Sequence, residues 1–143
     1  MRGDGLMTVG ELAHRTGLSI KAIRRYEGLG LIYSAGRSES GYRLFDDSAL
    51  WCAQVISRLR SLALTIKEIT ELGRAHLDRP REPLGPHVAV LLDRATQRID
   101  ERIADLVAVQ RRIDAYRSEH AAALAGDPRA DLLGRDPRRQ HAA

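Results

Sequence analysis

The first apolar positions of the chain are spaced for two short helices. The segment 8–11 (Thr-Val-Gly-Glu) fits a capping box, and Gly17 fits the left-handed residue that follows a helix, so we expect a helix between them. Ser19 is placed to cap a second helix, with Ile20 and Ile23 expected on its inner face. Two short helices separated by such a glycine turn predict a helix-turn-helix.

The next segments predict a β-hairpin and two further helices. Gly41 and the small polar residues before it mark the tip of a hairpin between short strands. Residues 46–48 (Asp-Asp-Ser) offer N-caps for a third helix, and residues 65–68 (Thr-Ile-Lys-Glu) form a second capping box that opens a fourth. The expected apolar positions of these two helices are Leu50, Val55, Ile56 and Leu59, and Ile66, Ile69 and Leu72.

A long heptad helix is predicted in the second half of the chain. Residues 78–86 contain three prolines and predict a linker, whereas residues 87–123 contain no proline or glycine. A helix of this length, roughly 55 Å, is too narrow to bury its own apolar stripe and needs a partner helix. The positions that repeat at heptad spacing, and that we expect to form the dimer contact, are Leu92, Ile99, Leu106, Val109, Ile113 and Tyr116, with Ala95 in the same series.

Arg102 interrupts this apolar series. It stands where Val109 and Tyr116 have their counterparts one and two heptads later. We expect it to pair with an acidic residue of the partner helix and to fix the register, although a leucine would be more stabilising there. Unchanged dimer affinity after removal of the charge would refute this hypothesis.

Composition favours a mainly α-helical fold. Aromatic residues are only 4% of the 143, so the core must rest on aliphatic side chains. Cys52 is the single cysteine, which excludes an intramolecular disulfide. No apolar run approaches the ~20 residues that span a bilayer, and the first residues show no apolar secretory core. We therefore expect a cytoplasmic protein.

The positive charge is concentrated near the amino terminus. The formal net charge is +4, and residues 1–45 carry seven basic and four acidic residues. If only the second helix carried basic residues, a solvent-exposed helix face would explain them. Further cations and a hydroxyl on the adjacent hairpin favour double-stranded DNA as the partner instead. The candidate contacts are Ser19, Lys21, Arg24, Arg25 and Tyr26 on the second helix, and Arg37, Tyr42 and Arg43 on the hairpin. Tyr26 is expected either to offer its hydroxyl to a phosphate or to pack its ring inward.

Several motifs resemble the opening of the MerR family of transcriptional regulators. They are residues 8–13 (Thr-Val-Gly-Glu-Leu-Ala), 16–19 (Thr-Gly-Leu-Ser), 22–27 (Ala-Ile-Arg-Arg-Tyr-Glu), 30–32 (Gly-Leu-Ile), and Arg37 with 41–43 (Gly-Tyr-Arg). The resemblance covers residues 7 to about 75 closely and matches the long helix in architecture. It implies a winged helix-turn-helix domain, which we place over 1–77, and antiparallel pairing of the long helices. Together with the proline and glycine positions, this predicts a linker over 78–86, a dimerisation coiled coil over 87–123 and a flexible tail over 124–143.

The resemblance also implies a mode of action. Members of the family are homodimers that bind near-palindromic operators within promoters whose −35/−10 spacer is overlong. They bend and untwist the DNA so that RNA polymerase engages both elements, which is indirect readout. By position, Ser19, Lys21, Arg24 and Tyr26 match the contacts of the family's recognition helix, and Arg37, Tyr42 and Arg43 match those of the wing. Departures are Arg25, where an aromatic is common, and the pair 33–34 (Tyr-Ser), where proline is common.

The sequence does not indicate an effector, and we expect no cofactor and no metal. Gly85 stands about where metal-sensing members carry a ligand cysteine, and no cysteine follows it. Iron–sulfur members need four cysteines, and drug-binding members carry a further domain. Cys52 is expected to be an inert core thiol rather than a reactive one. His76, His87 and His120 are expected on the surface rather than in a zinc site.

Rival functions remain at this stage. A repressor of the same fold differs from an activator only in its effect on transcription. A coiled-coil protein-interaction module accounts for the heptads but not for cations shared between helix and hairpin. An enzyme is not expected, because the chain shows no catalytic triad motif, phosphate-binding glycine loop or paired-carboxylate signal.

Overall fold

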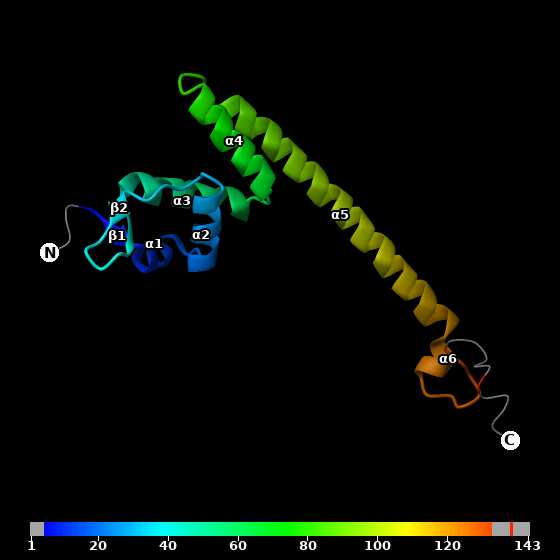
Figure 1. Cartoon of the computed structure of the whole chain (residues 1–143). Coiled ribbons are helices and arrows are strands. Elements are labelled where there is room, and N and C mark those ends of the chain that lie inside the picture. Colours follow the sequence, from blue (N-terminus) through cyan, green and yellow to red (C-terminus); the bar gives the residue numbers. More distant parts are fainter. Residues whose placement is uncertain (1–4, 133–137, 139–143) are drawn as a thin grey trace. The chain divides into compact units, whose positions relative to one another are not determined.

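The computed structural model describes residues 5–132 and 138 (Figure 1). The described chain divides into two compact units, one ending at Thr96 and the other beginning at Gln97. In order along the chain, the elements are β1 (Met7–Thr8), α1 (Val9–Thr16), α2 (Ile20–Gly28), β2 (Gly36–Arg37), β3 (Arg43–Phe45), α3 (Asp47–Ser61), α4 (Ile66–Asp78), α5 (Gly85–Glu119) and α6 (Ala121–Leu124). The expected mainly α-helical architecture with a small hairpin is confirmed.

Local capping sets the ends of the first two helices, as predicted. The Thr8 side chain accepts a hydrogen bond from the Glu11 amide at 3.3 Å, and the Ser19 hydroxyl accepts one from the Ala22 amide at 3.0 Å. Gly17 follows α1 with φ +73°, in the left-handed region that glycine adopts at little cost. The short turn between the caps produces the helix-turn-helix.

A three-stranded antiparallel sheet in the order β1-β3-β2 forms the wing. The predicted hairpin is present, with Gly36 opposite Leu44 and Arg37 opposite Arg43. The sequence analysis missed β1, which pairs with β3 through only two residues and is too short to show an alternating pattern.

Capping also sets the start of α3 and α4. Asp46 accepts from the Ala49 amide at 3.0 Å. Thr65 and Glu68 form the complete capping box, because each side chain accepts from the other residue's backbone amide, at 3.1 and 2.9 Å. Both predicted caps of these helices are confirmed.

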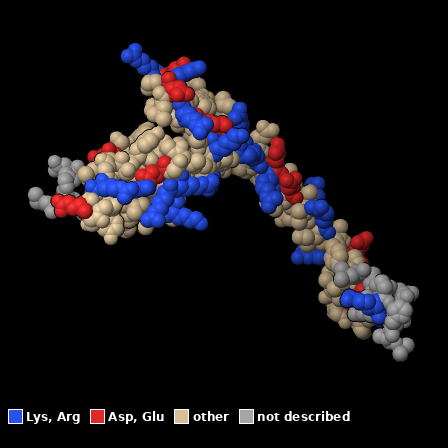
Figure 2. All heavy atoms as spheres, viewed as in Figure 1, with Lys and Arg blue, Asp and Glu red and all other residues tan. Residues whose placement is uncertain are grey.

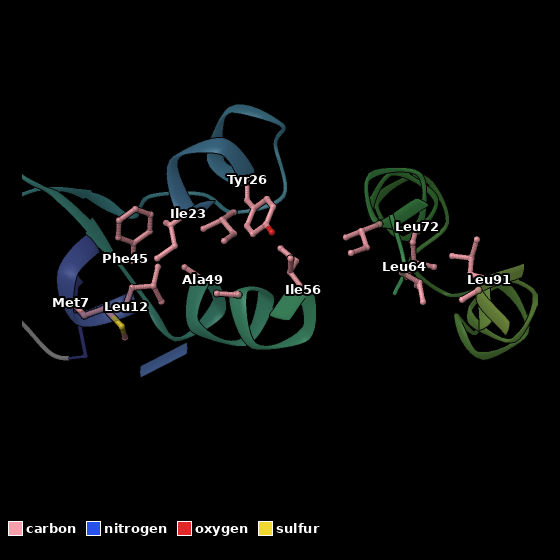
Figure 3. Packing of buried hydrophobic residues seen from close by; sticks show 14 residues of the cluster. Met7, Leu12, Ile23, Tyr26, Phe45, Ala49, Ile56, Leu64, Leu72 and Leu91 are labelled. Carbon is pink, nitrogen blue, oxygen red and sulfur yellow. The ribbon is translucent and has the colours of Figure 1, made fainter. Parts of the chain in front are cut away.

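Aliphatic side chains from all helices of the first unit form its core (Figure 3). Leu12, Ile23 and Leu64 are fully buried, and Tyr26 is only 5% exposed. Ile20 was expected on the inner face of α2, but it is 41% exposed. The buried stripe of α2 is instead formed by Ile23 and Tyr26, and Ile20 lies in the first turn, one turn before the core begins.

The long helix starts and ends at positions that differ from those predicted. It begins at Gly85, two residues earlier than expected, because Pro86 in the first turn needs no hydrogen-bond partner for its nitrogen. It ends at Glu119, where neither glycine nor proline marks a stop, and α6 follows. Leu91 and Ala95 at its start are buried in the core of the first unit, so that unit extends past the predicted linker at 78–86.

In the second unit, the end of α5 is held to the segment that follows it. The Tyr116 ring stacks on His120 with centroids 4.1 Å apart, and its hydroxyl donates to the Leu132 carbonyl at 2.8 Å. The expected loose tail is thus tied by a hydrogen bond at Leu132, whereas 133–137 and 139–143 lie outside the described residues. No helix in the described part of the chain is long and apolar enough to cross a bilayer.

Candidate nucleic-acid interface

One face of α2 presents the polar and basic side chains that the sequence singled out. Ser19, Lys21, Arg24 and Arg25 are all exposed, while Ile23 between them is buried. The spacing follows directly from burial of Ile23 and Tyr26, which turns the intervening positions to solvent. Figure 2 shows Lys and Arg side chains gathered along one side of this unit. The amino-terminal half of a recognition helix is the part that usually enters the major groove.

The hairpin tip is closed by its own hydrogen bonds, and its two basic residues, Arg37 and Arg43, are exposed. The Ser38 amide donates to the Tyr42 carbonyl at 2.7 Å, and the Gly41 amide donates to the Ser38 carbonyl at 2.9 Å. Gly41 has φ +85°, which makes glycine the favoured residue at this turn. Arg37 donates to the Gly41 carbonyl at 3.3 Å. Tyr42 is 68% exposed, so its hydroxyl is accessible to a ligand.

An ion pair joins α2 to the hairpin. The Arg43 guanidinium donates to the carboxylate of Glu27, whose side chain is only 14% exposed, whereas that of Arg43 is 51% exposed. Arg24, Glu27, Arg37 and Arg43 together line a groove between the helix and the hairpin. Of the predicted cations, Arg24 from α2 and Arg37 and Arg43 from the hairpin therefore lie on one surface, which we call the cationic groove.

Sequence reasoning missed the role of Glu27. This residue stands in the motif 22–27 and among the acidic residues near the amino terminus, but no partner was predicted for it. A signal was available, because Glu27 lies one turn after Arg24 on a helix face that is otherwise basic or neutral. An acidic residue among basic side chains would repel phosphate. The ion pair with Arg43 explains why Glu27 lies there.

The structure places Tyr26 in the core rather than on the exposed face of α2. Its ring packs near Ile23 and Ile56 and is 5% exposed (Figure 3). This matches the alternative in which the ring packs inward, and a contact between its hydroxyl and phosphate stays a prediction. Arg25, the departure from the family pattern, is exposed at the same end of α2.

Substituting Glu27 by glutamine should lower the ability to discriminate between DNA sequences. Loss of the charge frees the Arg43 guanidinium from α2 and removes a repulsion toward phosphate. We expect affinity for random-sequence DNA to rise and the ratio of specific to non-specific affinity to fall several-fold, measured by competition binding. Glu39→Gln removes the same charge from the exposed hairpin tip and is the matched control. An equal effect of both substitutions would contradict a positioning role for Glu27.

A second exposed surface lies on α5. The side chains of Ile99, Leu106, Val109 and Ile113 are between 40% and 49% exposed, and those of Leu92 and Tyr116 are 37% and 38% exposed. The predicted stripe is therefore open in this chain. Its width was underestimated, because Ile103 and Val107 beside it are 54% and 37% exposed. Arg102 is also exposed. Its pairing with an acidic residue of a partner helix stays a prediction.

The side chain of Cys52 is half-buried on α3. Burial, and then the nearby carboxylate of Asp46, raise the pKa of its thiol. Both effects disfavour the thiolate, which is the reactive form, and agree with the inert interpretation. His76 is exposed, and His87 and His120 are half-buried. Among the described residues, no three His, Cys, Asp or Glu side chains come together in a way that could hold a metal ion.

The raised pKa predicts slow alkylation of Cys52. Near neutral pH, iodoacetamide should react with Cys52 several-fold more slowly than with a free cysteine. The pH midpoint of the rate should also lie above that of the free thiol. Asp46→Asn keeps an N-cap for α3 but removes the charge, so the midpoint should move down. A native midpoint below that of free cysteine would contradict this assignment.

Comparisons with known proteins match this chain to DNA-binding regulators of similar fold. The model of the MerR family regulatory protein matches residues 8–45, and that of MerR, DNA binding, matches residues 53–116. The transcription regulator PbrR691 from Ralstonia metallidurans, solved in complex with lead(II), is 30% identical with a TM-score of 0.65, over 78% of this chain and 85% of that one.

Curated relatives match about half of this chain. An uncharacterized HTH-type transcriptional regulator of Pseudomonas aeruginosa is 40% identical over 75 residues, or 52% of this chain and 57% of the relative. Heavy metal-dependent transcription regulator 2 of Rhizobium meliloti is 39% identical over 75 residues, or 52% of this chain and 51% of the relative. The chain thus spans about half the length of the curated relatives it matches.

Proposed function

Because the chain belongs to the MerR family of transcriptional regulators, we propose that it binds promoter DNA as a homodimer and activates transcription by distorting that DNA. The observation that carries this proposal is the cationic groove, in which exposed residues of α2 and the hairpin lie together and are joined by the Glu27–Arg43 pair. Such an arrangement suits a duplex, because a helix enters the major groove while the wing contacts the flanking backbone.

Each side chain has a distinct role in this proposal. Lys21, Arg24 and Arg25 lie on the exposed face of α2, where they reach base edges and the adjoining phosphates. The Ser19 hydroxyl already accepts from the Ala22 amide, so its own proton is available to a phosphate oxygen. On the hairpin, Arg37, Tyr42 and Arg43 contact the neighbouring backbone, which fixes orientation rather than sequence.

The open apolar stripe of α5 supports the homodimer. A second copy covers this stripe in an antiparallel pair and brings two cationic grooves to one DNA molecule. Two recognition helices on a two-fold axis read half-sites that are separated by whole helical turns, which predicts an inverted repeat as operator. Action on chromosomal DNA also places the protein in the cytoplasm.

Distortion is the step that turns binding into activation. Bending a site of 20–30 base pairs costs about 1–6 kcal/mol, and contacts from two grooves offset that cost. A promoter whose spacer is overlong holds its two elements at the wrong relative twist. Bending and untwisting bring both elements into reach of RNA polymerase, which is the further partner in this proposal.

Transcription in vitro tests the proposed direction of regulation. The operator is first recovered by selecting bound duplexes from the DNA upstream of the gene. The native promoter is then transcribed by RNA polymerase with and without the protein, beside a version with a shortened spacer. We expect more transcript from the long-spacer promoter and none of this gain from the shortened one. Reduced transcript from both promoters assigns the protein as a repressor, and failure to select any duplex favours a protein-interaction module.

A further inference from the structure

An apolar pocket opens in the first unit, away from the cationic groove. Its volume is about 160 Å³, and its walls come from α3, from α4 and from segment 29–33, which directly follows α2. Trp51 and Val55 contribute from α3, and Gly73 and Leu77 contribute from α4. No step of the proposed function uses this pocket.

The lining of the pocket selects for an uncharged ligand. It is almost entirely carbon, and the hydroxyl of Thr70 in its wall already donates to the Ile66 carbonyl at 2.7 Å. A charged ligand would lose its hydration without gaining enough partners there. The remaining polar groups of the lining, at Cys52, Arg74 and His76, are few and are outnumbered by apolar side chains.

Size narrows the ligand further. An engineered cavity of ~150 Å³ lined by aliphatic and aromatic side chains stays dry and binds benzene. The pocket here has a similar volume, about 160 Å³, but it is open to solvent at Tyr33 and Trp51, so a molecule of one aromatic ring with a small substituent would bind with part of its surface still in water. Exposed Trp51 and Tyr33 border the pocket and offer ring faces to such a molecule.

The pocket is connected to the recognition helix through its own wall. The Leu29 amide donates to the Arg25 carbonyl at 3.0 Å, and the Leu31 amide donates to the Tyr26 carbonyl at 2.9 Å. Leu31 also lies so close to α4 that a Cβ on Gly73 would come within 2.9 Å of it. A ligand that enters between this segment and α4 would displace the segment. Through the two hydrogen bonds, that displacement would shift the last turn of α2.

We propose that this pocket binds a small uncharged aromatic molecule and that its occupancy changes the affinity of the cationic groove for DNA. The second half rests on the proposed function, whereas the first half does not. The pocket thus supplies an effector site inside the DNA-binding unit.

Two single residues of the chain report on binding. Trp51 is the only tryptophan and Cys52 the only cysteine, and both line the pocket. The full chain is titrated with toluene while the fluorescence of Trp51 and the alkylation rate of Cys52 are followed. We expect a saturable fluorescence change with a dissociation constant on the order of 1 mM, and slower alkylation. Benzylammonium, which has a similar shape and carries a positive charge, should produce neither effect.

A matched pair of variants locates the site. Val55→Phe fills the pocket and should weaken toluene binding at least tenfold, whereas Val90→Phe adds the same ring at an exposed position of α5 outside the pocket and should leave binding unchanged. If Val55→Phe does not fold, Thr70→Met fills the same space from α4. The absence of saturable binding, or an equal response in the filled variant, overturns the proposal.

Three further outcomes separate this proposal from its alternatives. If toluene binds only when the protein is diluted to monomers, and Val55→Phe weakens self-association, the pocket belongs to a second copy and the proposal is overturned. Operator affinity is then measured with and without saturating toluene, and an unchanged value overturns the regulatory half. Failure to bind DNA both with and without toluene refutes the proposed function instead and leaves the binding result standing.

Discussion

Replacing Lys21, Arg24 and Arg43 together by alanine is expected to lower the affinity for operator DNA by roughly a hundredfold or more. Each side chain that contacts DNA contributes about 1–3 kcal/mol, and each 1.4 kcal/mol is a factor of ten. All three side chains are exposed in the first unit, and Arg24 and Arg43 line the cationic groove. Electrophoretic mobility shift at fixed salt measures the effect.

The control removes the same charge elsewhere. Arg94, Arg111 and Arg112 are exposed on α5, outside the cationic groove. Their joint replacement by alanine changes the net charge equally but should leave operator affinity within a few-fold of the native value. Equal losses in the two triple variants would mean that total charge, rather than the groove, carries the binding.

The second large effect is expected at the α5 stripe. Leu106→Glu should raise the dissociation constant of the dimer by roughly a hundredfold or more. It replaces a half-exposed apolar side chain by a charge that a partner helix would bury, and it does so twice in a symmetric dimer. Sedimentation equilibrium over a dilution series measures the constant.

Ala108→Glu is the matched control for this substitution. It adds the same charge on the same helix, but position 108 lies across α5 from the stripe residues Leu92 and Ile99. It should leave the dissociation constant close to the native value. A dimer that tolerates Leu106→Glu as well as Ala108→Glu would show that the stripe is not the contact.

Features set by neighbouring residues were predictable from the sequence. The caps at Thr8, Ser19 and Thr65 act within three residues of themselves, and each starts its helix where predicted. The exposed basic residues of α2 were predictable for a similar reason. Because α2 buries Ile23, the side chains of Lys21, Arg24 and Arg25 turn outward.

Features that depend on distant contacts were not predictable. Strand β1 exists only because β3 lies beside it, and the partner of Glu27 lies sixteen residues away. The heptad pattern predicted a dimer contact along α5, which stays a prediction, and missed Leu91, which is buried in the core of the first unit. The start of α5 packs into the core of the first unit, whereas its later turns carry the exposed stripe. A single heptad repeat cannot describe both kinds of position.

The salt dependence of operator binding tests the central claim most directly. Each phosphate contact releases counterions, so the logarithm of the affinity falls against the logarithm of the salt concentration with a slope near −0.9 per contact. For a dimer with two cationic grooves we predict a slope of about −4 or steeper, shallower by about one for each contacting cation removed. A slope near zero, or one that is the same in the Lys21, Arg24 and Arg43 triple variant, would contradict the account.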